Sequence, residues 1–309
     1  MERLCAVSVD LDEIPLYHAI HGLPPPAGPS AHAVYELGLP RLAELARAEA
    51  LPLTLFAVGA DMAREASARA LRGMAERGHE IGNHSLDHPY DLVRRPRAEL
   101  ERQVRAAITV LEAATGARPT GFRAPGYTIT DELFEVLAEA GVAYDSSVFP
   151  CPPYYAAKAV KLALIRARGR RSRSILDTPR VLSAPRAPYR VGRPYWRRGT
   201  GLVELPITVT RLARLPFIGT SLMLAGPARA RWLTRAVVGA PLVNLELHGV
   251  DVLDASDGLA PLRHHQVDLG VSAARKLETL SAVVDVLRRA GYRFVRLDEA
   301  ARRVVCEST

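Results

Sequence analysis

Short apolar segments alternate with longer amphipathic ones along most of the chain, and this alternation constrains the fold more than any other feature. Segments such as "CAVSVDLD", "LPLTLFAVG" and "HEIGNH" are typical of buried strands. Helical spacing of apolar residues follows them, and Gly78 and Gly141 mark helix ends. Strands are predicted at 5–12, 51–59, 79–84, 119–125, 142–148, 241–249 and 292–297, and helices at 31–50, 61–78, 97–115, 130–141 and 272–290. The pattern favours an α/β fold of parallel βα units in a closed or distorted barrel.

The segment at about 150–240 departs from this rhythm because it is rich in Pro and Arg and its apolar stretches are broken by Pro and Gly. We therefore interpret the chain as one domain, 1–309, with an elaborated basic insertion at about 150–240. Between Lys158 and Arg198 there are thirteen Lys and Arg residues and one acid, Asp177. The formal net charge of +8 thus belongs to one segment, and the rest of the chain is slightly acidic.

The composition also limits the class of protein. Three cysteines (Cys5, Cys151 and Cys306) are too few and too scattered for a disulfide framework, which suits a reducing compartment. The first residues, "MERLCAVSVDLD", lead directly into a strand and do not form a secretory signal. No run reaches the ~18 to 20 apolar residues that cross a bilayer. We expect a cytoplasmic protein. A peripheral location at the inner face of the membrane is compatible with this expectation.

Polar residues gather where the predicted strands end. They are Asp10 and Asp12 after the first strand, His84 after the third, Arg123 after a middle one and His248 after a late one. In βα barrels the carboxyl ends of the strands carry the active site. Each residue alone has an ordinary structural explanation, such as a helix cap or a satisfied strand-end histidine. Their convergence at one end favours a site.

Four segments, in this order, resemble the motifs of the polysaccharide deacetylase superfamily (NodB homology, carbohydrate esterase family 4). They are "SVDLD" (8–12), "HSLDHP" (84–89), "RAPGY" (123–127) and "LELH" (245–248). The second segment matches a His-x-x-x-His-Pro motif and is the most specific of them. The resemblance spans nearly the whole chain and implies a distorted (β/α) barrel of NodB type.

The resemblance also implies a metal site. Asp12, His84 and His88 would bind a divalent metal, for which zinc is the expected ion. A backbone N–H near Gly126 or Tyr127 would help to hold the oxyanion.

The same resemblance implies an acid–base pair. Asp10 would take a proton from the attacking water, Arg123 would hold Asp10 ionised and aimed, and His248 would protonate the departing sugar amine. Asp251, three residues after His248, is either a partner of this imidazole or an ordinary loop carboxylate.

The chain departs from the usual motifs in two ways. Leu11 separates Asp10 from Asp12, a spacing similar to that of an atypical Asp-x-Asp branch. That branch contains the deformylases of lipid-linked aminoarabinose and some atypical peptidoglycan deacetylases. No Asp-Trp motif of the acetyl pocket is present in the right context. Glu204, in "GLVELP", either faces the site or lies at a sheet edge.

The loop "LYHAIHG" (16–22) follows the first motif directly, so we expect it to overhang the site. Tyr17, His18 and His21 are its candidate substrate contacts. The neighbouring histidines at 264 and 265 are expected on the surface.

Three interpretations fit the basic segment at 154–198. The first is a solvated loop, and the second is an amphipathic basic helix that lies on anionic lipid. The third, which agrees least with the pattern, is a nucleic-acid contact. No nucleic acid is expected because no recognition fold accompanies the charge.

Together these features predict a hydrolase that removes an N-acyl group, in the first place N-acetyl, from an amino sugar in a metal-dependent reaction. The substrate would be a free sugar conjugate, a cell-envelope glycan precursor or a glycolipid. The alternatives are a deformylase of a lipid-linked 4-amino sugar and a non-catalytic relative that binds carbohydrate or lipid.

Overall fold

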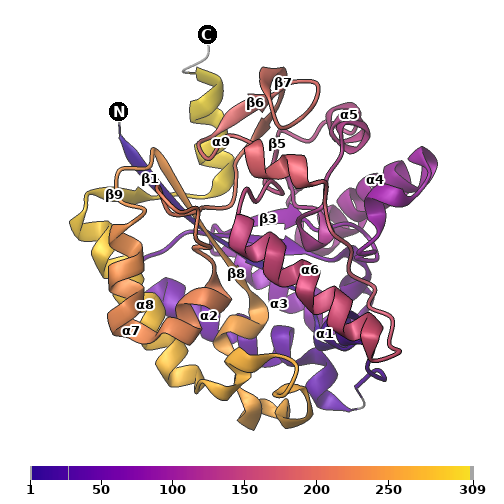
Figure 1. Cartoon of the computed structure of the whole chain (residues 1–309), viewed down its shortest axis with the longest axis vertical. Helices are drawn as coiled ribbons and strands as arrows, with labels where there is room; N and C mark the ends of the chain where they lie inside the picture. Colours follow the sequence, from indigo (N-terminus) through magenta and orange to yellow (C-terminus); the bar gives the residue numbers. More distant parts are fainter. Residues whose placement is uncertain (1, 27, 307–309) are drawn as a thin grey trace.

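The computed structural model describes residues 2–26 and 28–306, and within them a nine-stranded sheet curls into a half-barrel with helices on its outer face (Figure 1). The strands are β1 (Arg3–Asp10), β2 (Leu53–Ala57), β3 (Glu80–Asn83), β4 (Gly121–Phe122), β5 (Tyr144–Asp145), β6 (Tyr189–Val191), β7 (Arg198–Glu204), β8 (Leu242–His248) and β9 (Tyr292–Phe294). The helices are α1 (Ile14–His21), α2 (Leu39–Ala48), α3 (Glu65–Glu76), α4 (Arg97–Thr115), α5 (Asp131–Glu139), α6 (Pro152–Ala167), α7 (Gly219–Arg235), α8 (Ala273–Arg289) and α9 (Leu297–Cys306). The expectation of an α/β fold with a distorted barrel is confirmed.

The strands follow the order β6-β7-β5-β4-β3-β2-β1-β8, and all neighbours except β6 and β7 are parallel. β8 pairs with one edge of β1 along residues 4–10, while the other edge of β1 is shared by β9 and β2. The segment between β7 and α7 bridges the remaining gap, because the Thr208 N–H donates to the Asn244 carbonyl and Ile218 pairs with Glu246. This irregular bridge is where the barrel departs from regular closure.

The two faces of β1 and β8 have different chemistry. The outward residues of β1, such as Val7 and Val9, pack with the surrounding helices. Its inward residues are apolar at the N-terminal end of the strand, where Leu4 and Ala6 contact α9. They are polar toward the C-terminal end, where Ser8 and Asp10 follow. β8 repeats this gradient with Leu242, Asn244, Glu246 and His248. Because side chains alternate along a strand, this spacing places an apolar base and a polar upper layer inside one barrel.

Part of the expected insertion at 150–240 belongs to the barrel, which corrects the sequence prediction. β7 pairs with β5 in the main sheet, and α7 packs along α8. The pattern concealed α7 because Gly226 and Pro227 lie inside it, and Gly226 adopts a φ of 71°. What remains outside the βα rhythm is α6 and the chain from there to β7.

The segment after the first motif is a helix, α1, although we expected a loop. The Glu13 carboxylate caps it by accepting the Ile14 N–H and also accepts the N–H groups of Val34 and Tyr35. These bonds fix α1 beside the upper end of β1. Within the described part of the chain, no helix combines the length and apolar character needed to cross a membrane.

Candidate metal centre and active site

The loop that carries the paired histidines is built by hydrogen bonds within its own few residues. The Asn83 side chain accepts the Ser85 N–H at 2.8 Å, and the Ser85 hydroxyl accepts the His88 N–H at 3.1 Å. Ser85 and His88 both adopt positive φ angles, 67° and 51°. Gln103 on α4 accepts the N–H groups of the two intervening residues at 3.1 and 2.9 Å. These bonds hold a strained turn that brings both imidazoles to the same point.

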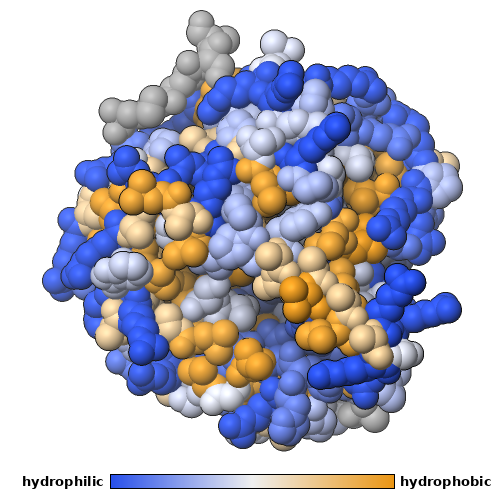
Figure 2. Space-filling view, viewed as in Figure 1, coloured by the Kyte–Doolittle hydropathy of each residue, from blue (hydrophilic) through white to orange (hydrophobic). Residues whose placement is uncertain are grey.

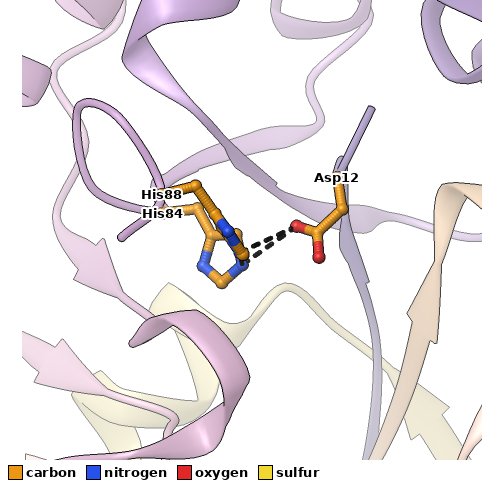
Figure 3. Close-up of side chains that lie close together, drawn as sticks. All are labelled: Asp12, His84 and His88. Carbon is orange, nitrogen blue, oxygen red and sulfur yellow. Dashed lines mark hydrogen bonds and ion pairs between the residues drawn. The ribbon is translucent and has the colours of Figure 1, made fainter. Parts of the chain in front are cut away.

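Three buried donor atoms converge at this point (Figure 3). The Nε2 atoms of His84 and His88 lie 3.1 Å apart, and they lie 3.2 and 3.3 Å from Oδ1 of Asp12. His84 Nδ1 lies 2.7 Å from the Arg123 carbonyl, which can only accept, so this nitrogen carries the proton. With its proton on Nδ1, the neutral form of His84 has the lone pair of Nε2 available for a metal ion beside Asp12.

The donor set fits a divalent metal ion. Asp12 Oδ1 is buried and receives no hydrogen bond from any described group. Burial raises the pKa of Asp12, but the two histidines outweigh this effect and hold the pKa well below its usual range. That lowering requires positive charge beside Asp12, and a divalent metal ion between the three atoms would supply it while both imidazoles are neutral. Two His and one Asp are also ligands that zinc accepts while leaving a position open.

The other side of the site contains two charge pairs. Arg123 Nη1 donates to Oδ1 of Asp10 at 2.7 Å, and Nδ1 of His248 lies 2.9 Å from Glu246 Oε1. Burial alone would lower the pKa of His248, but Glu246 and the two nearby aspartates raise it well above its usual value. These carboxylates therefore favour the doubly protonated imidazole, which is the form that can act as a proton donor.

The Arg123 guanidinium is fully buried and its donors are satisfied. Nε donates to the Ser146 carbonyl at 2.9 Å, and Nη2 donates to the hydroxyls of Ser8 and Ser146 at 2.9 and 2.8 Å. The group also stacks on the Phe56 ring, 4.3 Å from its centroid. A buried charge with this many partners is held rigidly, so the orientation of Asp10 is fixed from below.

The "RAPGY" loop places a phenol in the site. Gly126 and Tyr127 both adopt positive φ, 63° and 59°. The Tyr127 N–H donates to the Ala124 carbonyl at 3.0 Å, so it is not the oxyanion donor that we expected. Its hydroxyl instead lies 3.4 Å from Nε2 of His248 and faces the cavity.

A cavity of about 510 Å³, a volume typical of small-molecule sites, lies above these groups. Helix α6 covers it. Its lining comprises Asp10, Asp12, Tyr17, Ile20, His21, His84, Tyr90, Gly126, Tyr127, Pro153, Tyr154, Ala157, Lys158, Lys161, Leu162, Ile165, Ser174, Pro216, Ile218, Thr220, Ser221, His248 and Gln266. A larger hollow of about 750 Å³ lies at the opposite ends of β2 and β3, beside Pro52 and His79, and has no metal-ligand cluster in its lining. The chemistry therefore belongs to the smaller cavity.

The structure brings most of the predicted site residues together, with some corrections in the loop after the first motif. Tyr17 lines the cavity, but His18 does not, because its Nδ1 is bound to the Pro24 carbonyl at 2.6 Å. His21, one turn later, takes that place, with His265 stacked 5.1 Å from it. His264 is exposed, as expected.

Glu246 is the functional residue that the sequence prediction missed. Asp251, which we considered as the partner of the imidazole, accepts the backbone N–H of His248 instead, at 2.8 Å. Glu204 does not face the cavity: it is buried, forms a register pair with Asp145 and accepts the Val148 N–H. The available signal for Glu246 was its position two residues before His248, which places both side chains on one face of β8.

Residues 32–144 match the family model for polysaccharide deacetylase. The chain is 27% identical over 158 residues to a peptidoglycan deacetylase of Helicobacter pylori, which covers 50% of this chain and 53% of that protein. It is 34% identical over 94 residues to a chitooligosaccharide deacetylase of a Bradyrhizobium species, covering 30% and 42% of the two chains. The matches thus span about half the length of these relatives.

Solved structures extend the likeness in fold to the whole chain. A structure from Mycobacterium smegmatis, assigned to the polysaccharide deacetylases, covers 100% of this chain and 92% of its own, with a TM-score of 0.61 at 19% identity. A family 4 pseudoenzyme from Bacillus anthracis covers 97% and 66%, with a TM-score of 0.51 at 13% identity. Residues 32–144 thus carry the match to the polysaccharide deacetylase family, and the fold of the whole chain is similar to that of a solved structure assigned to this family.

Proposed function

We propose that this protein is a metal-dependent hydrolase that removes an N-acyl group, in the first place N-acetyl, from an amino sugar. The observation that carries the proposal is the cluster of Asp12, His84 and His88 beside a carboxylate and a protonated imidazole at the floor of one cavity. Its relatives named as peptidoglycan and chitooligosaccharide deacetylases support this reaction class.

Zinc is the ion that we propose for the three-residue cluster. When bound there, it would polarise the acyl carbonyl, acidify water and stabilise negative charge. The protein contributes a dry, fixed donor set, because all three side chains are almost completely buried. His84 is oriented by its bond to the Arg123 carbonyl, which is the kind of outer hydrogen bond that fixes a metal-binding histidine.

Asp10 is the proposed base. Its Oδ1 is occupied by Arg123, which leaves Oδ2, 3.8 Å from His84 Nε2, to accept a proton from the attacking water. Although Leu11 separates Asp10 from Asp12, both carboxylates line the same cavity. The register therefore keeps the base next to the metal cluster.

His248 is the proposed acid. Its Nδ1 is bound to Glu246, so Nε2 is the nitrogen that can give a proton to the departing amine. The Tyr127 hydroxyl, 3.4 Å from Nε2, can hydrogen-bond the same part of the substrate.

Acyl release tests the proposal directly. Purified protein would be loaded with zinc or treated with a chelator and mixed with N-acetyl and N-formyl amino sugars, both free and linked to polyprenyl phosphate. We expect zinc-dependent release of acetate, detected by mass spectrometry together with the deacylated sugar. Formate release alone would identify a deformylase. No release from any conjugate by zinc-loaded protein would favour a non-catalytic protein that binds carbohydrate or lipid.

We also propose that the protein works at an anionic membrane surface. The outward face of α6 carries apolar side chains at helical spacing, with Val160 and Leu164 exposed by 60% and 52%. Figure 2 shows apolar side chains along this face. Arginines follow at its C-terminal end, at positions 166, 168, 170, 171 and 173. An apolar stripe flanked by arginines is complementary to anionic lipid, so a cytoplasmic enzyme at the inner face could meet a glycolipid there.

Vesicle binding tests the membrane proposal. We expect cosedimentation with phosphatidylglycerol vesicles at low salt, weaker binding to phosphatidylcholine, and about tenfold weaker binding of a V160S/L164S variant, because the two side chains lose apolar burial. Lack of binding to phosphatidylglycerol at low salt would overturn it.

A further inference from the structure

The upper wall of the cavity has a different charge from its floor. Among the residues that line it, Asp10 and Asp12 are the only carboxylates, and both lie at the floor. The upper wall is formed by α6, whose inward face carries Lys158 and Lys161. Residues three apart on a helix lie on one face, so the two ammonium groups form a line along the cavity.

Lysine is rare in this chain, and its placement is informative. Only three of the 41 basic residues are lysines: Lys158, Lys161 and Lys276. Lys276 is fully buried and pairs with Asp268 at 2.9 Å, so its role is structural. Within the described residues, neither cavity lysine has a carboxylate within 4.0 Å. The chain therefore directs two ammonium groups into a cavity without giving them an anionic partner.

Lys158 is held close to the reacting groups. Its ammonium donates to the Gly126 carbonyl at 2.9 Å, which leaves two of its three N–H donors for other partners. A Cβ on Gly126 would lie 3.5 Å from Lys158 Nζ and 3.3 Å from the Tyr90 ring. That ring in turn packs against His88, with centroids 4.5 Å apart. Tyr90 thus lies between Gly126, to which the Lys158 ammonium is bound, and His88 of the metal cluster.

The charge of Lys158 persists at neutral pH. Burial lowers its pKa to about 8, and Asp177 opposes this effect. That carboxylate is already engaged, because it accepts the Thr178 N–H at 2.6 Å and the Tyr195 hydroxyl at 3.1 Å. A half-buried ammonium without an ion-pair partner is costly, and an anionic ligand would offset that cost.

We propose that Lys158 and Lys161 form a phosphate-binding subsite, so that the substrate is an N-acyl amino sugar that carries a phosphate. This inference rests on the proposed N-deacylase function and specifies its substrate class. Two point charges in line suit a dianionic phosphate, for which lysine is a common ligand. Beyond them the wall is apolar, with Ile20, Leu162 and Ile165, so the phosphate can belong to a soluble sugar phosphate or to a lipid-linked one.

Phosphate binding tests the subsite without turnover. Inorganic phosphate would be titrated calorimetrically into the full-length protein, with and without zinc. In both forms we expect the K158Q/K161Q variant to bind at least about tenfold more weakly than the natural protein. A matched variant, R229Q/R231Q, removes two exposed charges from α7 and should bind as the natural protein does. Equal affinity of the natural protein and K158Q/K161Q would overturn the subsite.

Turnover then identifies the source of the phosphate. The substrates would be N-acetylglucosamine, its 1-phosphate and its polyprenyl-phosphate conjugate in detergent. We expect K158Q/K161Q to raise KM about tenfold for a phosphorylated substrate and to leave the neutral sugar unaffected. A raised KM for the soluble 1-phosphate would identify a sugar phosphate as a substrate, and a raised KM for the lipid conjugate alone would identify a lipid-linked one. An equal rise in KM for the neutral sugar would overturn the assignment.

Two further controls keep the inference testable. If the double variant does not fold, K161Q alone, at an exposed rim position, should still weaken phosphate binding severalfold, and unchanged binding would count against the subsite. Failure of all substrates to release an acyl group, with lysine-dependent phosphate binding intact, would reject the reaction and retain the subsite.

Discussion

The two halves of the site are built in different ways. The histidines of the metal half, His84 and His88, belong to one loop that is folded by its own side chains and by one glutamine from α4. The acid–base half is assembled from distant strands: Asp10 on β1 is the register partner of His248 on β8. Arg123, which holds Asp10, follows a third strand. The histidine loop is therefore encoded locally, whereas the position of Asp12 and the whole acid–base half depend on the arrangement of the sheet.

The halves also differ in electrostatics. The acid–base half is internally paired, since Arg123 neutralises Asp10 and Glu246 pairs with His248. The metal half brings two imidazole nitrogens and one carboxylate oxygen together, and the Asp12 oxygen receives no hydrogen bond from the described residues. This difference is the reason that we propose a bound cation for the metal half and none for the acid–base half. Removing single residues from each half should therefore have distinct signatures.

The largest effect is expected for Asp12→Ala. This change removes the only anionic ligand of the metal cluster, so zinc affinity and kcat/KM should fall, the latter by on the order of 10³-fold because a metal supplies several kcal/mol to such reactions. Zinc content after dialysis and acyl release measure both. Asp285→Ala, on the exposed side of α8, is the matched control. Full zinc content in the Asp12 variant would refute the ligand assignment.

Glu246→Gln should separate the halves. Zinc content should be unchanged, while kcat falls by on the order of 10²-fold because His248 loses the carboxylate that orients and charges it. Glu246 raises the pKa of His248, so its removal should move the basic limb of the kcat–pH profile to lower pH. An unshifted basic limb would mean that His248 is not the proton donor.

This contrast also explains how far the sequence could predict the site. The histidine loop was recognisable because its ligands and their supports lie within a few residues. The positions of Asp10 and His248 were recognisable as strand ends, and the register then confirmed that they meet. Glu246 was missed because a glutamate in a strand is usually a surface residue, and the sequence alone did not show that its side chain points into the barrel. The difference between His18 and His21 required the helix α1, whose cap at Glu13 was not apparent.

The fold shows the same division. The βα rhythm predicted the parallel strands and most of the outer helices. It could not predict that β7 joins the sheet. Nor could it predict that two helical segments, separated by a kink at Gly226 and Pro227, would both belong to α7, which packs along α8. Nor could the sequence show that α6 covers the cavity with two lysines on its inner face.

Gln103→Ala tests whether the histidine loop depends on its support from α4. Its side chain accepts two N–H groups of the histidine loop, so the truncation should loosen His88 and weaken zinc binding by about tenfold, within the range for outer-layer changes. Competition with a chromogenic chelator would measure the affinity. Thr109→Ala, on the exposed side of the same helix, is the control. Unchanged affinity would show that the loop is held by Asn83 and Ser85 alone.

The smallest effect is expected from a carboxyl pair outside both halves. Burial raises the pKa of Glu204 well above its ordinary value of 4.5, and Asp145 beside it adds to the shift. A raised pKa means that the folded protein keeps a proton that the unfolded chain releases, so stability declines as pH rises from the ordinary value through the folded one. Glu204→Gln removes this decline. The variant should gain on the order of 1 kcal/mol in unfolding free energy, relative to the natural protein, between about pH 5 and about pH 8.

Urea unfolding at the two pH values measures that difference. Glutamine still accepts the Val148 N–H and can donate to Asp145, so the fold should be kept. Because Glu204 lies outside the cavity, zinc content and acyl release should be unaffected. A difference that is the same at both pH values would mean that Glu204 is ionised in the folded protein. The buried charge of Arg123 would then have to balance this carboxylate as well as Asp10, and the acid–base half would no longer be paired within itself.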